Sequence, residues 1–250
     1  MPKLYVISDI HGFYNEMKEA LDEAGFDPDN KEHWLISLGD EVDRGNHPLA
    51  VISYLQSLER CICVRGNHSD LLLQCIQRSY PLSHDWSNGT AQTIIDLAPE
   101  AQTFDEACKI SYDKVKDFIY SSVNYFESEN YIFVHSWVPL KCNDKLPAHY
   151  IRNRKFEFDP DWRNADTDAW YRARWGNPYE LAEQGFLPDK TLIFGHFHTS
   201  WPRAQYHMEQ EFGPNADFSI YYGDRYIAID ACTAYSGKVN VLVLEDNFLE

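Results

Sequence analysis

One pattern recurs five times along this chain: an apolar run of strand length is followed at once by a short polar loop. Runs that are apolar at nearly every position are typical of strands covered on both faces of a sheet. The runs and their loops are 4–7 with 8–12, 34–38 with 39–45, 61–64 with 65–70, 131–134 with 135–137, and 191–194 with 195–199. This alternation, with helices predicted at 14–24, 48–58 and 70–78, indicates an α/β layered sheet whose ligands bind outside the carboxyl ends of the strands.

The C-terminal part follows a different pattern. Residues 218–222, 225–230 and 238–244 are rich in β-branched and aromatic residues and are separated by Gly-containing turns, which predicts an antiparallel meander. Residues 138–189 show no single strong period, so we expect them to be an insertion packed over the scaffold. The prediction is a single domain over residues 1–250.

The overall charge limits the classes of partner. The chain has 39 Asp and Glu against 22 Lys and Arg, which gives a formal net charge of −17. Stable nucleic-acid binding relies on a basic surface, so we expect none here, although a small, locally basic pocket remains compatible with this charge. No apolar run approaches the roughly 20 residues of a membrane span, and an apparent strand begins by residue 3, before any signal peptide could end. Together with scattered cysteines, these features predict a cytoplasmic protein without a membrane partner.

The five polar loops concentrate side chains that bind metals or phosphate. In chain order they are Asp9 and His11; Asp40, Asp43 and Arg44; Arg65, Asn67 and His68; His135; and His196 and His198. A single Asp-x-His on its own favours a turn or a helix cap. Five such loops at the ends of strands indicate a shared site instead.

Seven of these residues are candidate metal ligands: Asp9, His11, Asp40, Asn67, His135, His196 and His198. Imidazole, carboxylate and amide oxygen without thiolate suit Mn, Fe or Zn rather than a structural zinc site. Seven ligands are too many for one catalytic ion that keeps an open position. We therefore predict two divalent ions that share one carboxylate, with manganese as the first choice and iron or zinc as alternatives.

The motifs that carry these residues are D-I-H-G at 9–12, G-D-E-V-D-R-G at 39–45, R-G-N-H at 65–68, a lone His135, and G-H-F-H at 195–198. This series resembles the calcineurin-like metallophosphoesterase superfamily. The D-R-G and R-G-N-H forms are most similar to its serine/threonine phosphoprotein phosphatase branch, which includes bacterial protein phosphatases and symmetrical diadenosine tetraphosphatases. The resemblance implies an α-β-β-α sandwich with mixed sheets, C-terminal antiparallel strands and an inserted flap.

The resemblance also implies a role for each residue. Asp9, His11 and Asp40 would hold the first metal, with His198 either a further ligand or a neighbour of the ligands. Asp40 would bridge to the second metal, which Asn67, His135 and His196 would also bind. His68 would be the general acid, Asp43 would orient it and raise its pKa, and Arg44 and Arg65 would bind the phosphate oxygens.

Three features depart from the family pattern. Ser69 intervenes before the acidic Asp70, where the family usually has an acidic residue directly after R-G-N-H. A bulky Trp137 follows the lone histidine, and it either walls the metal site or covers the sheet. Arg172 and Arg174, in R-A-R-W-G-N-P, are each either a further phosphate-binding arginine or an exposed helix charge.

The leading expectation is a phosphatase for phosphoserine and phosphothreonine in proteins, in which a metal-bridging hydroxide attacks phosphorus directly. The alternatives are a symmetrical dinucleoside polyphosphate hydrolase, a phosphodiesterase, and a metal-binding regulatory domain without catalysis. The partner would be a phosphorylated protein or a small phosphoester. A basic stretch with Lys145, Arg152 and Arg154 either collects an anionic substrate or neutralises the acidic residues that follow it.

Overall fold

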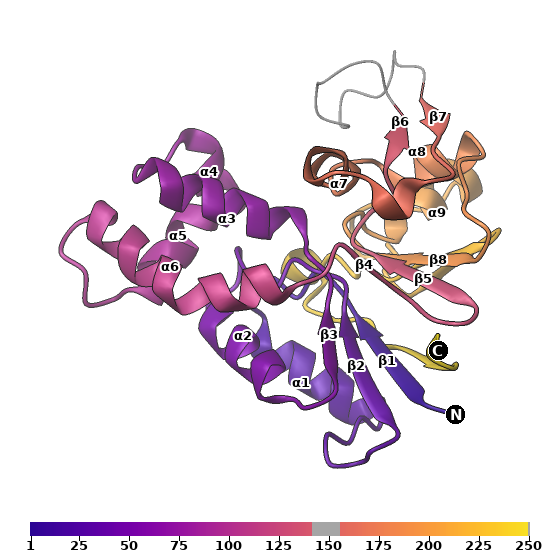
Figure 1. Cartoon of the computed structure of the whole chain (residues 1–250), viewed down its shortest axis with the longest axis horizontal. Helices are drawn as coiled ribbons and strands as arrows, with labels where there is room; N and C mark the ends of the chain where they lie inside the picture. The colour runs from indigo at the N-terminus through magenta and orange to yellow at the C-terminus, as the bar shows by residue number, and fades with distance from the viewer. Residues whose placement is uncertain (142–155, 250) are drawn as a thin grey trace.

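The computed structural model describes residues 1–141 and 156–249, and its layers can be followed in Figure 1. The basic stretch with Lys145, Arg152 and Arg154 lies outside these described residues. Four strands form the first sheet in the order β11-β1-β2-β3, with β1, β2 and β3 parallel and β11 antiparallel to β1. Their bounds are Lys3–Ile7 for β1, His33–Ser37 for β2, Cys61–Cys63 for β3 and Leu242–Glu245 for β11.

Five strands form the second sheet in the order β4-β5-β8-β10-β9. The three inner strands are parallel, and the outer strands β4 and β9 run antiparallel to their neighbours. The bounds are Tyr125–Glu127 for β4, Tyr131–Val134 for β5, Thr191–Phe194 for β8, Tyr221–Gly223 for β9 and Tyr226–Ala228 for β10. A separate antiparallel pair is formed by β6 (Leu140–Lys141) and β7 (Glu157–Phe158).

The two sheets pack face to face through a fully apolar layer. Leu4 and Ile36 of the first sheet belong to one buried cluster with Phe133 and Ile193 of the second, and all four are completely buried. Because strands inside such a sandwich have no face in water, they read as continuous apolar runs rather than as alternating ones. The burial therefore explains the pattern that the sequence shows.

Helices cover the outer face of each sheet. The first sheet is covered by α1 (Tyr14–Glu23) and α2 (Pro48–Ser57), and a lobe of α3 (Asn67–Arg78), α4 (Ser83–Asn88), α5 (Thr90–Leu97) and α6 (Phe104–Ser121) extends from it at the left of Figure 1. The second sheet is covered by α7 (Thr167–Ala173), α8 (Pro178–Glu183) and α9 (Ser200–His207), with a 3-10 turn at Trp162–Asn164. A short helix, α10 (Thr233–Ser236), lies between β10 and β11 in the chain. This arrangement confirms the predicted α-β-β-α sandwich with mixed sheets.

Two predictions about individual elements were wrong. The helix predicted at 70–78 begins three residues earlier, so Asn67 and His68 lie in the first turn of α3. The predicted meander does not form, because β9 and β10 pair with each other while β11 joins the first sheet. In that sheet Leu242 lies opposite Val6 and contributes to the apolar layer between the sheets.

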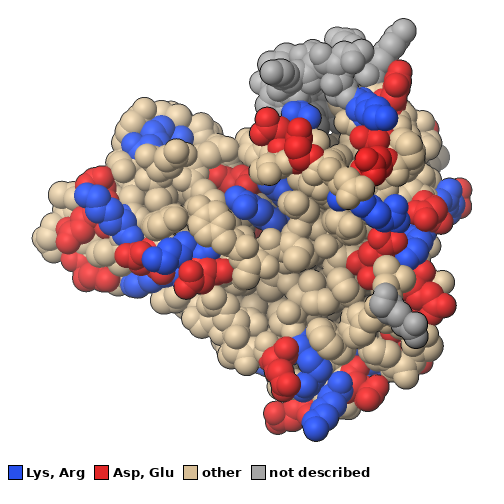
Figure 2. Space-filling view, in the orientation of Figure 1, with Lys and Arg blue, Asp and Glu red and all other residues tan. Residues whose placement is uncertain are grey.

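The surface carries charges of both signs. On the face drawn in Figure 2, acidic and basic side chains lie next to one another around the periphery. The acidic surplus is therefore not concentrated in a single patch on this face. None of the helices among the described residues combines the length and the apolar character needed to cross a membrane.

Candidate active site

The polar loops after β1, β2, β3, β5 and β8 converge at one edge of the sandwich. Backbone conformation there is unusual, because six site residues have positive φ angles: Asp9, His11, Asp40, Asp43, Arg44 and His196. Non-glycine residues rarely adopt this left-handed region, and such strain gathers at functional sites where the surrounding structure holds it in place. The loops are thus fixed in conformations that the bare chain would avoid.

A close approach of two loops requires glycine at position 66. A Cβ atom there would lie 2.2 Å from Oδ1 of Asp40 and 2.4 Å from its backbone nitrogen. Gly66 has no positive φ, so its role is to let the loop after β3 touch the loop after β2. This contact places Asn67 and His68 against Asp40.

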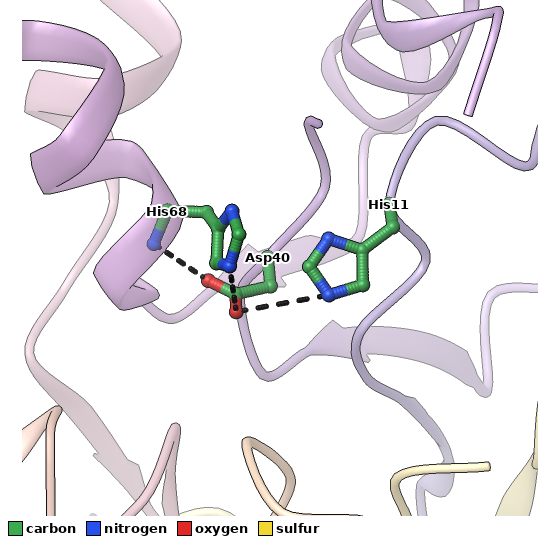
Figure 3. Close-up of side chains that lie close together, drawn as sticks. All are labelled: His11, Asp40 and His68. Carbon is green, nitrogen blue, oxygen red and sulfur yellow. Dashed lines mark hydrogen bonds and ion pairs between the residues drawn. The ribbon is translucent and has the colours of Figure 1, made fainter. Parts of the chain in front are cut away.

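The first group of facing ligand atoms belongs to His11, Asp40 and His68 (Figure 3). Oδ2 of Asp40 lies 4.0 Å from Nε2 of His11 and 3.9 Å from Nε2 of His68. Oδ1 of Asp40 accepts a hydrogen bond from the backbone N–H of His68 at 2.9 Å. Asp9 borders this group, with its Oδ1 4.0 Å from Nε2 of His11.

The second group shares Asp40 with the first and adds His135 and His196. Nε2 of His135 lies 3.4 Å from Oδ2 of Asp40 and 2.7 Å from Oδ1 of Asn67. The same Asn67 oxygen lies 3.0 Å from Nδ1 of His196. Asp40 therefore stands between the two groups, as the predicted bridging carboxylate would.

The donor chemistry of both groups fits divalent metal ions. Nδ1 of His135 donates to the carbonyl of Leu38 at 2.8 Å, and Nδ1 of His11 lies 2.9 Å from the carbonyl of Val42. When these Nδ1 atoms carry the proton, each Nε2 presents a lone pair to the carboxylate and amide oxygens that surround it. Buried acceptor atoms that face one another are brought together favourably by a cation, and ligating histidines are oriented in this way by a bond from the other ring nitrogen.

Burial disfavours the charged form of each side chain in this cluster. Neighbouring charges reinforce that effect on the pKa at Asp9 and His196 and reverse it at Asp40 and His135. Burial and repulsion by Asp230 raise the pKa of Asp9 well above its usual value. Burial opposes ionisation of Asp40, but attraction by His135 prevails and lowers its pKa well below the usual value. Attraction by Asp40 also outweighs burial at His135 and raises the pKa of this imidazole to about 9. Burial and the positive charge of His135 lower the pKa of His196 to about 3. Because a histidine binds a metal only through an unprotonated nitrogen, metal binding at His135 would be opposed by this raised pKa.

His68 and Asp43 form a buried pair beside the first group. Nδ1 of His68 donates to Oδ2 of Asp43 at 2.6 Å, so Nε2 points toward Asp40. Nη2 of Arg44 lies 3.5 Å from that Nε2. Nε2 of His68 and the guanidinium of Arg44 therefore face the same side of the site.

The structure places the two predicted arginines differently. Arg44 lines a cavity of about 190 Å³, and Arg65 is not among the residues that line it. Arg65 instead pairs with Oδ1 of Asp70 at 2.7 Å, while Arg174 donates to Oδ2 at 2.7 Å. The acidic residue displaced by Ser69 therefore does find arginine partners, and Arg174 is a buried structural group rather than an exposed helix charge.

Among the described residues, His198 belongs to neither group of facing ligand atoms. Its Nε2 lies 3.1 Å from Oε1 of Glu211, and its ring stacks on Phe197. His198 is also absent from the described residues that line the cavity. Of the two readings left open for His198, this position supports a neighbour of the ligand loop.

Aromatic residues near the site also have distinct roles. Trp137 is buried and packs near Phe194, so it covers the sheet rather than walling the site. Trp175 does line the cavity, together with Leu71 and Asn88. Sequence reasoning missed Asn88, because no motif marks a residue that a distant helix brings to the site.

A family model for calcineurin-like phosphoesterases matches residues 2–224, and the chain belongs to this family. Over 74 residues it is 42% identical to a symmetrical bis(5'-nucleosyl)-tetraphosphatase from Glaesserella parasuis serovar 5, an alignment that covers 29% of this chain and 26% of the relative. The chain thus spans only about a quarter of the length of this relative.

Two solved structures share the fold. One is described as a putative diadenosine tetraphosphatase, with 14% identity, a TM-score of 0.54 and coverage of 100% of this chain and 97% of the other. The second is a cold-active protein-tyrosine phosphatase of a psychrophilic Shewanella, with 16% identity, a TM-score of 0.56 and coverage of 98% and 76%. At such identities the likeness concerns the fold and does not select a substrate. Family and site together define a metal-dependent phosphoesterase.

Proposed function

We propose that this chain is a symmetrical dinucleoside polyphosphate hydrolase, which splits a dinucleoside tetraphosphate into two nucleoside diphosphates. The observation that carries the proposal is the 42% identity to a relative named for that reaction. It supports the alternative expected from the sequence more than the leading expectation of a phosphoprotein phosphatase. Two residues that line the cavity have the chemistry to contact a nucleotide, because the cation of Arg44 suits phosphate oxygens and the ring of Trp175 suits a stacked base.

In this proposal Asp9, His11 and Asp40 would hold one divalent ion, and Asp40, Asn67, His135 and His196 would hold the other. Manganese is the proposed ion, with iron and zinc also suited to these nitrogen and oxygen ligands. Such ions neutralise phosphate oxygens and lower the pKa of water when they are bound. Side chains of the protein would supply phosphate binding and proton donation.

Arg44 binds phosphate oxygens, since its guanidinium faces the cavity beside His68. His68 delivers the proton at Nε2 to the leaving oxygen, and Asp43 keeps the ring oriented through Nδ1. Arg65 supports the site indirectly through Asp70, which lies on the first turn of α3 with Asn67 and His68. We do not assign it direct contact with phosphate.

A second candidate, a phosphatase for phosphoserine and phosphothreonine, is favoured by the His68–Asp43 pair. An alkoxide is a poorer leaving group than a phosphate oxygen, so it needs proton donation more strongly. Asp43 is completely buried and lies 2.6 Å from Nδ1 of His68. This bond would orient His68 for the proton donation that an alkoxide leaving group needs. The two candidates therefore share one catalytic site and differ in what the outer cavity recognises.

The test compares four substrates under initial-rate conditions with Mn²⁺: diadenosine tetraphosphate, a phosphoserine peptide, a phosphodiester and p-nitrophenyl phosphate. We expect the highest kcat/KM for diadenosine tetraphosphate, with ADP as the single nucleotide product. ATP and AMP as products, or a higher kcat/KM for the peptide, would overturn the proposal. An Asp40→Asn variant controls for contaminating phosphatases, because it changes the carboxylate that both ligand groups share.

A further inference from the structure

The Asp43 carboxylate is held by more than His68. Oδ2 of Asp43 accepts two hydrogen bonds, one from Nδ1 of His68 at 2.6 Å and one from the hydroxyl of Thr90 at 2.6 Å. Both Asp43 and Thr90 are completely buried. Oδ1 of Asp43 has no hydrogen-bond partner among the described residues. One oxygen of a buried carboxylate thus carries both bonds, and the other carries none.

Thr90 is the first residue of α5, and a second residue of this helix also forms a hydrogen bond with Asp43. One turn along the helix, the hydroxyl oxygen of Thr93 accepts a hydrogen bond from the backbone N–H of Asp43 at 3.1 Å. Gly89 allows the helix to start so close, because a Cβ atom there would lie 2.5 Å from the backbone nitrogen of Arg44. The start of α5 is therefore packed directly against the loop that carries Asp43 and Arg44.

Asp43 needs such support for two physical reasons. Its φ of 74° lies in the left-handed region, which is unfavourable for a residue with a side chain. Its carboxylate plane could also turn about χ2, because the outer torsion of an aspartate is broad. The Thr90 bond restricts this rotation and so holds the accepting oxygen in line with Nδ1 of His68.

We propose that Thr90 is a positioning residue for proton donation: its hydroxyl fixes the Asp43 carboxylate, which in turn orients His68. This inference rests on the proposed role of His68 as the proton donor. It does not depend on which phosphoester is the natural substrate. The helical lobe of α3 to α6 then contributes to the catalytic pair as well as to the apolar core beside the first sheet.

The test compares Thr90→Val, which keeps the shape and removes the hydroxyl, with Thr90→Ser, which keeps the hydroxyl. Each variant is assayed on phenyl phosphate, which needs a proton on its leaving oxygen, and on p-nitrophenyl phosphate, which needs it far less. We expect Thr90→Val to lower kcat on phenyl phosphate about tenfold more than on p-nitrophenyl phosphate, as the loss of one aligned hydrogen bond predicts. Thr90→Ser should restore most of this difference.

Two controls separate positioning from general destabilisation. Ser111→Ala removes another completely buried hydroxyl of the same lobe, which donates to the carbonyl of Ile94 at 2.9 Å, and it should affect both esters equally. In a His68→Asn background, Thr90→Val should cause no further loss on phenyl phosphate, because the group that Thr90 positions is already gone.

An equal loss on both esters, or a fully additive loss in the His68→Asn background, would overturn the role of Thr90. If Thr90→Val does not fold, Thr90→Ala is assayed below its melting temperature with the same expected ratio and the same overturning results. Both esters are simple substrates for a metallophosphoesterase. Failure to hydrolyse diadenosine tetraphosphate would therefore reject the proposed substrate and leave this inference standing.

Discussion

Asp70 holds two arginines at once, so removing its carboxylate is expected to destabilise the fold strongly. The side chains of Asp70 and Arg174 are only 6% and 5% exposed, whereas Arg65 is 21% exposed. Asp70→Ala leaves the buried Arg174 guanidinium without an opposite charge. Arginine cannot shed its proton in a protein, so it cannot escape this cost by becoming neutral.

The expected magnitude follows from the burial of this pair. Removal of one partner of a buried ion pair costs about 3–5 kcal/mol. Arg174 retains one hydrogen bond, from Nη1 to Oδ1 of Asn124 at 3.1 Å, which favours the lower end of that range. Arg65 adds little because water reaches it. We expect a loss of about 3 kcal/mol, which for a chain of this length corresponds to a fall in Tm of about 6–12 °C.

The assay is urea unfolding followed by tryptophan fluorescence, with EDTA present so that metal binding does not contribute. Asp113→Ala is the matched control, since it removes an exposed carboxylate whose partner is the surface Lys116, and it should not shift the midpoint measurably. An Asp70→Leu, Arg174→Met double variant should recover most of the loss. An unchanged midpoint for Asp70→Ala would refute the argument that this buried pair stabilises the fold.

Three further predictions concern the metal site. Asp40→Asn should lower the metal content at both positions, measured by mass spectrometry of the dialysed protein; retention of two ions per chain would argue against a shared ligand. In the metal-free chain His135 has its pKa raised to about 9 from 6.5, so its stabilising charge is complete below about pH 6.5 and is lost as the pH rises through about 9. Chemical denaturation should therefore show falling stability over that window without metal, and an unchanged stability would contradict the attraction between His135 and Asp40. Gly66→Ala should abolish activity and metal binding, because the new Cβ would meet Asp40 at 2.2 Å; normal metal content would show that the loops can separate at little cost.

The layered architecture was predictable because each buried strand leaves a local signature. Leu4 and Ile36 lie in runs that are apolar at nearly every position, and both are completely buried in the structure. The place of the final strand was not predictable, because β11 pairs with β1 at the opposite end of the chain. A local pattern indicates that Leu242 belongs to a strand, but not which sheet edge receives it.

The site shows the same division between local and distant information. Asp40 and His135 follow strands directly, so their convergence could be expected from the edge at which parallel strands end. Thr90 precedes no strand and belongs to no recognised motif, yet it bonds to Asp43, 47 positions earlier in the chain. Arg174 was ambiguous for the same reason, because its partner Asp70 lies 104 positions away.

The two groups of ligand atoms differ in how they depend on the sandwich. The proposed ligands of the first ion, Asp9, His11 and Asp40, all follow strands of the first sheet, whereas His135 and His196 follow strands of the second. The first ion would thus be bound within one sheet, and the second would join both. Any sliding of one sheet against the other would distort the second position and spare the first. The second ion would consequently link the two sheets and would be released first when they move apart. Its occupancy would therefore report how well the two sheets are aligned.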